Sequence, residues 1–204
     1  MLSALVTGII LGLTAGLTPG PLMTLVIAQT LQYGFREGAL IATAPLITDV
    51  PIILVSLFTL ARLAEFEPIL GLVALVGSLY IFYLAYETLR TGPVGVGKSE
   101  PAAKSLRKGA IINALNPHPY LFWATVGAPL ILRAERSETL APWLFVGSFY
   151  LFLIGSKVVI ALIVGRFRAF LSDKPYIYIM RTLAVLLAGL AILLFRDAFV
   201  LMRH

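Results

Sequence analysis

Thirty-five residues pass before the first charged side chain, Arg36, and long uncharged stretches recur along the rest of the chain. A helix needs roughly 20 apolar residues to cross a hydrocarbon core about 30 Å thick. Only 13% of the 204 residues are charged, whereas soluble domains carry about 25%. We therefore predict an all-α integral membrane protein that consists of a single transmembrane domain, residues 1–204.

Six segments are long and apolar enough to span a bilayer. They cover approximately residues 2–33, 39–61, 68–90, 109–132, 140–165 and 175–195. The stretch 91–108 is basic, rich in Gly and Pro, and lacks apolar periodicity, so it is predicted to be a flexible loop. This loop divides the chain into two three-helix halves, about 1–90 and 109–204.

The basic residues between the spans predict the orientation. Nine lie on the side of the 91–108 loop and five on the other side. Because cytoplasmic loops carry the excess of Lys and Arg, we expect this loop in the cytoplasm of a multi-pass plasma-membrane protein, with both termini outside. The same distribution explains the formal charge of +6 without a nucleic-acid partner.

A proline-rich interruption divides the first segment, which would otherwise be about 50 Å long at 1.5 Å per residue. It consists of Thr18, Pro19, Gly20 and Pro21. The two prolines lack backbone donors and clash with the carbonyls of Ala15 and Leu17. Unpaired backbone groups are tolerated at membrane depth only where protein buries them or water reaches them, so we expect the break to face the bundle interior or a cavity.

The fourth segment contains a second interruption of the same kind. It consists of Asn113, Asn116, Pro117, His118 and Pro119. Here the prolines free the carbonyls of Asn113 and Leu115. Three helices in each half give the halves opposite orientations, an inverted repeat in which paired interrupted segments indicate a transporter's binding site. A purely structural role, two proline kinks that shape the bundle, is the alternative.

Two charged residues are predicted deep in the membrane, Asp49 in the second segment and Lys157 in the fifth. Their depths differ by roughly 3 Å when counted along ideal helices, so they could form an ion pair. Such residues are functional candidates: Asp49 could bind a substrate ammonium or a coupling proton, and Lys157 a substrate carboxylate. A fixed structural ion pair is the alternative. His118 could relay protons, but a satisfied polar contact is the favoured interpretation.

Small and aromatic residues suggest how the helices pack. Gly8, Gly12 and Gly16 recur every four residues and permit close helix approach, which we assign to internal packing rather than to a dimer interface. The sequence is also compatible with a homo-oligomer and does not determine the oligomeric state. The tryptophans Trp123 and Trp143 are interpreted as interface-belt or core residues rather than as ligand-stacking groups.

Together these residues resemble the lysine exporter (LysE/RhtB-type) family of amino-acid exporters. The resemblance rests on the Pro-Gly-Pro of the first segment, Gly34-x3-Gly38, Asp49, Gly77-Ser-Leu-Tyr80, and Gly109-x3-Asn113-x2-Asn116-Pro117. It implies six helices, export of amino acids or similar small metabolites, and coupling to the proton gradient. It also implies that the signature positions are Pro19, Gly20, Pro21, Asp49, Asn116 and Pro117. The chain departs from the family pattern at Thr48, Pro51 and Lys157.

Two other functions remain open at this stage, a metal or inorganic-ion exporter and a membrane assembly subunit without transport. A metal site would need clustered carboxylate or His ligands, and Asp49 is the one deep acidic residue. No zinc-protease, rhomboid-like or phosphatase constellation is present in the sequence. We therefore expect a transporter rather than an enzyme, with no cofactor or resident metal, whose partners are an amino-acid-like solute, protons and membrane lipids.

Overall fold

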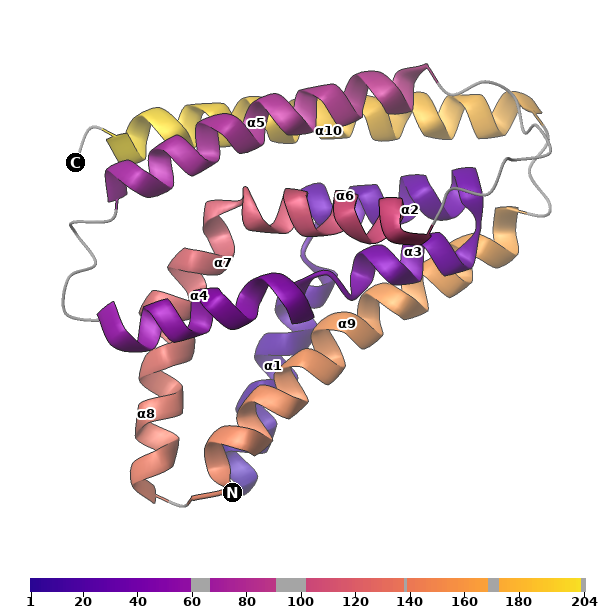
Figure 1. The fold of residues 1–204 in the computed structure, drawn as a ribbon. Coiled ribbons are helices and arrows are strands. Elements are labelled where there is room, and N and C mark those ends of the chain that lie inside the picture. The colour runs from indigo at the N-terminus through magenta and orange to yellow at the C-terminus, as the bar shows by residue number, and fades with distance from the viewer. Residues whose placement is uncertain (60–66, 91–101, 138, 169–172, 203–204) are drawn as a thin grey trace.

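The computed structural model describes residues 1–59, 67–90, 102–137, 139–168 and 173–202, and every regular element within these ranges is a helix (Figure 1). The elements are α1 (Leu2–Leu17), α2 (Pro21–Tyr33), α3 (Phe35–Ala42), α4 (Pro45–Thr59), α5 (Glu67–Leu89), α6 (Ala102–Ala114), α7 (Pro117–Phe122), the π-helical turn η2 (Trp123–Gly127), α8 (Ala128–Ser137), α9 (Ala141–Arg168) and α10 (Asp173–Met202).

The first predicted interruption is confirmed. Helices α1 and α2 are bent by 63° relative to each other. The backbone is extended at Thr18 and Gly20, and Pro21 occupies the first position of α2. Proline suits that position because its fixed φ is already helical and the missing donor has no intrahelical partner there.

The second interruption is also confirmed, but the helix before it begins earlier than predicted. Helix α6 starts at Ala102, so residues 102–108 are not part of a flexible loop; residues 91–101 lie outside the described part of the chain. The reason is tertiary: Ser105 and Lys108 are buried, and Lys108 Nζ lies 2.8 Å from Glu87 Oε1 of α5. Thirteen residues of α6 therefore precede this break, compared with sixteen of α1 before the other.

The predicted spans are confirmed only in part. Within the described residues, four helical spans are long and apolar enough to cross a membrane, or five if the bent α1–α2 pair counts as one. One of these spans, Phe35–Leu57, joins α3 and α4. The predicted fourth span is divided among α6, α7, η2 and α8, none of which has the length to cross alone.

Three helix pairings organise the bundle (Figure 1). Helices α5 and α10 form one layer and run antiparallel, since Gly71 near the start of α5 lies against Ala198 and Met202 at the end of α10. Helix α1 runs parallel to α9. The α3–α4 span runs parallel to α6, because Gly109 lies against Ile41 and Asn113 bonds Thr48.

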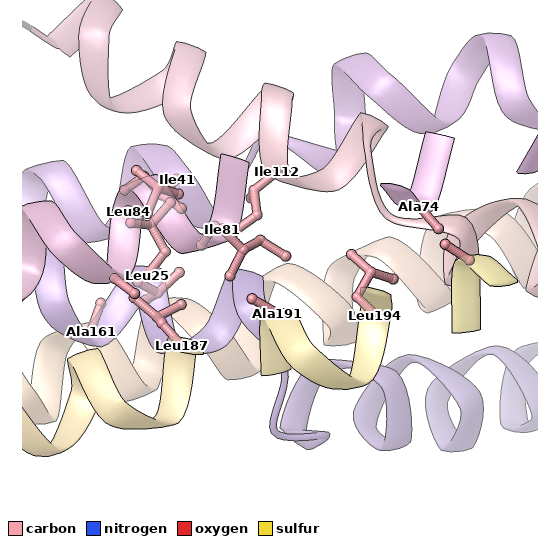
Figure 2. Close-up of a cluster of buried hydrophobic side chains, with 14 residues drawn as sticks. Leu25, Ile41, Ala74, Ile81, Leu84, Ile112, Ala161, Leu187, Ala191 and Leu194 are labelled. Carbon is pink, nitrogen blue, oxygen red and sulfur yellow. The ribbon is translucent and has the colours of Figure 1, made fainter. Parts of the chain in front are cut away.

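The main apolar core joins these pairings. It contains Leu25 of α2, Ile41 of α3, Leu84 of α5, Ile112 of α6 and Leu187 of α10, all of which are almost fully buried (Figure 2). In a membrane such packing stabilises through van der Waals contact rather than through the exclusion of water. The core therefore holds the α5–α10 layer against the helices that flank the two breaks.

The glycine stripe of α1 packs against α9, which confirms the prediction of internal packing. A Cβ atom added at Gly12 would overlap the carbonyl oxygen of Phe149, and one added at Gly8 would meet Phe145 and Ser148. At Gly16 it would meet Leu153 and Ser156. Helix α1 can approach α9 this closely only because these positions lack side chains.

We predict that Gly12→Ala lowers thermal stability in detergent by about 1 to 3 kcal/mol, the usual cost of overpacking a tight contact. The added methyl group meets backbone atoms of Phe149, which cannot move aside without displacing α9. Gly147→Ala in α9 is the matched control, because nothing lies within 4 Å of its added Cβ. Equal unfolding midpoints for the two variants would contradict the proposed role of the stripe.

Candidate functional site

A cavity of about 530 Å³ lies between the two helix breaks. Its polar lining comes from both interruptions, from the two deep charges and from Thr125 of η2, and its apolar lining comes mainly from α2, α7, α9 and α10. The volume is within the range of small-molecule sites, about 300 to 1,000 Å³. The apolar lining residues include Leu22, Met23, Leu121, Phe122, Leu153 and Leu190.

The structure brings nine of the ten predicted site residues to this cavity. They are Thr18, Pro19, Gly20, Pro21, Asp49, Asn113, Asn116, His118 and Lys157. Pro117 is buried at the first position of α7 and does not line the cavity. The side chains of Thr18 and His118 are exposed, so the cavity is open where they stand.

Lys157 binds the backbone of the first break. Its Nζ atom donates to the carbonyl of Ala15 at 3.3 Å and to that of Gly16 at 3.1 Å. The prolines leave the last carbonyls of α1 without helical donors, and a cation at this end also interacts favourably with the helix dipole. The predicted unpaired carbonyl of Ala15 is thus satisfied by a buried charge.

The possible ion pair between Lys157 and Asp49 is absent from the described residues. Both side chains are buried to about the same degree and line the same cavity. Each is bound to other groups: Lys157 to the carbonyls of α1, and Asp49 to neutral donors. Lys157 is therefore bound at the first break and Asp49 near the second.

Asp49 is held by three helical elements of the second half of the chain. Asn113 Nδ2 of α6 donates to Oδ1 at 2.8 Å, and Tyr150 OH of α9 donates to Oδ2 at 3.1 Å. Trp123 Nε1 of η2 donates to Oδ2 at 3.4 Å. Only 4% of Asp49 is exposed. Such donors replace the water that a buried carboxylate loses.

The second break satisfies its own backbone by different means. The hydroxyl of Tyr120 donates to the carbonyl of Ala114 at 2.9 Å, and the side chain of Asn116 caps α7 by accepting from the backbone of His118 at 3.1 Å. The predicted free carbonyl of Asn113 accepts from the Asn116 backbone at 3.3 Å. The other, Leu115, lies against Gly77 of α5.

Trp123 and Tyr150 are site residues that the sequence did not reveal. The core alternative offered for Trp123 holds, since only 1% of it is exposed, but its indole also donates to Asp49. The two rings stack at 6.1 Å. No local sequence pattern connects them with Asp49, because Trp123 and Tyr150 are 74 and 101 residues away from it in the sequence. The one signal in the sequence is chemical: a buried Trp needs a hydrogen-bond acceptor for its indole N–H.

The sequence model of the LysE type translocator matches residues 13–198. The chain belongs to this family. The LysE-type chain is also 27% identical over 115 residues to a leucine efflux protein of Enterobacter sp. (strain 638). That alignment covers 53% of this chain and 54% of the relative, so the chain spans about half the length of the curated relative that it matches. No solved structure matches it.

Six of the positions that carried the resemblance to LysE-type proteins line one cavity: Pro19, Gly20, Pro21, Asp49, Asn113 and Asn116. In the described part of the chain, no three or more His, Asp or Glu side chains come together as a metal site would require. The two departures Thr48 and Lys157 are part of the same site: Thr48 accepts from Asn113 at 2.7 Å, and Lys157 binds the first break.

The π-helical turn offers a specific test of how Trp123 is positioned. A Cβ added at Gly127 would overlap the Trp123 ring, so Gly127→Ala should displace the indole from Asp49. In a Trp143→Phe background, which removes the exposed second tryptophan, we expect the emission of Trp123 to shift to longer wavelength. Gly155→Ala, which has nothing within 4 Å of its added Cβ, is the control. Superimposable spectra for both variants would rule out this positioning role.

Proposed function

We propose that this chain exports amino acids by alternating access at the cavity between its two broken helices. One observation carries the proposal: each half of the chain contributes a deep charge that binds the region of the other half's break. Asp49 of the first half accepts from Asn113 and Trp123, on either side of the second break. Lys157 of the second half donates to α1 at the first break.

The helix pairings support an inverted repeat of six spans. We number the spans as α1–α2, α3–α4, α5, α6–α8, α9 and α10. An inverted repeat exchanges the first span with the fourth, the second with the fifth and the third with the sixth. Under this exchange the contact between α1 and α9 becomes a contact between α6 and the α3–α4 span, and the contact between α5 and α10 is unchanged. All three of these helix contacts are observed. Asp49 and Lys157 then occupy equivalent helices.

The cavity suits a zwitterion with an apolar side chain. We propose that the ammonium of the solute binds Asp49, that its carboxylate binds Lys157, and that its side chain contacts Leu22, Met23 and Leu153. Asp49 and Lys157 carry opposite charges and are bound at different breaks. They therefore match the ammonium and the carboxylate at the two ends of an amino acid. Leucine is the first solute to test, because the similar Enterobacter protein is named for leucine efflux.

Proton coupling follows from competition at Asp49. A protonated carboxyl group becomes a donor and loses accepting capacity, so it cannot hold both the ammonium and its present donors. A proton entering from outside would therefore displace the solute, and the proton gradient would drive export. The excess of basic residues around loop 91–108 supports placing this loop in the cytoplasm of the plasma membrane, with both termini outside.

We predict that Asp49→Asn lowers leucine counterflow in proteoliposomes by roughly tenfold or more, since bonds to a charged group contribute about 1.5 to 3 kcal/mol. The amide keeps the size of the side chain and loses its charge. Acceleration by an imposed pH gradient should disappear together with counterflow. Labelled leucine uptake into preloaded vesicles measures both.

Asp197→Asn is the matched control for this experiment. Asp197 lies on α10, where it pairs with the exposed Arg196 at 3.4 Å, and it is not among the residues that line the cavity. Its counterflow should equal that of the unmodified chain. Equal leak through the unmodified chain and Asp49→Asn, across a mixture of labelled amino acids, would refute the exporter.

A further inference from the structure

A second cavity, of about 250 Å³, lies between α1, α8 and α9. Its polar lining consists of Ser3, Thr7 and Arg133. Within the described residues, the guanidinium of Arg133 has no hydrogen-bond or ion-pair partner. Arg133 is one of the five basic residues predicted on the side opposite the 91–108 loop, and its fork of donors suits a carboxylate.

The position of this cavity adds to its positive character. Ser3 and Ala4 belong to the first turn of α1, and Ala141 is the first residue of α9. The starts of helices carry partial positive charge. Neither of these first turns contains an acidic residue. The field from both helices therefore has the same sign as that of Arg133.

A layer of aromatic rings separates the second cavity from the central one. Phe149 lines the central cavity, and Phe145, one turn earlier on α9, lines the second. Their ring centroids are 6.3 Å apart. Phe122 stacks on Phe149 at 5.2 Å, and one helical turn is about 5.4 Å. A single aromatic layer thus lies between the two spaces.

The layer is connected to the carboxylate of the central site. Trp123 contacts Phe122 and Phe149 with ring centroids 5.3 Å apart in both cases, and the same Trp123 donates to Asp49. Tyr150, which also donates to Asp49, contacts Phe149 at 5.3 Å. A change in the groups that Asp49 binds therefore alters the hydrogen bonds of Trp123 and Tyr150, and these two rings contact the aromatic layer.

We propose that the second cavity is a further binding site for the exported solute, in which Arg133 binds the solute's carboxylate after the solute has passed the aromatic layer. This inference rests on the proposed function. The starts of α1 and α9 lie at the end of the bundle that the charge distribution assigns to the outside, which is where an exported solute leaves (Figure 1).

The absence of cysteine from the sequence permits a direct test with single-cysteine chains. Thr7→Cys reports on the second cavity and Thr18→Cys on the central one. The rate of alkylation by N-ethylmaleimide is measured in proteoliposomes with and without leucine. At twice the dissociation constant, leucine should slow each reaction by roughly threefold, since protection is 1 + [L]/Kd.

Variants of Arg133 complete the test. Arg133→Gln should abolish protection of Thr7→Cys and leave that of Thr18→Cys, while Arg133→Lys should retain part of the protection of Thr7→Cys and all of that of Thr18→Cys. Protection of Thr18→Cys alone in the unmodified background would overturn this inference and leave the proposed function standing. Protection of neither, by leucine or by a mixture of amino acids, would overturn both.

Two further outcomes separate the solute from a lipid headgroup, whose phosphate an arginine also binds. If Arg133→Gln leaves protection of Thr7→Cys unchanged, the assignment of the carboxylate to Arg133 is wrong. If protection appears with anionic phosphatidylglycerol vesicles in the absence of leucine and leucine adds nothing, Arg133 is a headgroup ligand and the second solute site is refuted.

Discussion

The bundle depends on backbone polar groups that cannot be left unpaired in a membrane. Two proline-rich interruptions remove helical hydrogen bonds, and in hydrocarbon each free carbonyl costs several kcal/mol unless it finds a donor. Lys157 supplies that donor to the end of α1, and Tyr120 supplies it to the end of α6. Three buried polar side chains, Asp49, Asn113 and Lys157, bind at or near the two breaks, and the central cavity forms between them.

Helices pack closely around the breaks at glycine residues, which have no side chain to keep the backbones apart. Gly12 brings α1 against α9, Gly109 brings α6 against Ile41, and Gly77 brings α5 against the carbonyl of Leu115. These contacts hold the halves of each broken helix in place while its interior hydrogen bonds are missing. A rigid frame around a locally unpaired backbone is the arrangement that lets a transporter bind polar solutes at mid-membrane depth.

The cavity and the aromatic rings share one group, Asp49. Its carboxylate accepts from Asn113, Trp123 and Tyr150, so a proton or a solute ammonium at Asp49 alters the bonds of two rings at once. Both rings contact Phe149, which forms part of the wall of the central cavity. One buried acid is thereby connected, through hydrogen bonds and ring contacts, to Phe149 in the wall of the central cavity.

The membrane class, both breaks and the deep position of Asp49 could be predicted from the sequence, because each depends on local physics: the length of apolar segments, proline's missing donor, and the cost of a charge in hydrocarbon. The sequence also indicated the family through those same positions. The tertiary structure alone decided that Lys157 binds α1 and not Asp49, that Trp123 and Tyr150 hold the carboxylate, and that α6 begins at Ala102. Those partners come from helices distant in sequence, and only the packing of one helix on another selects among them.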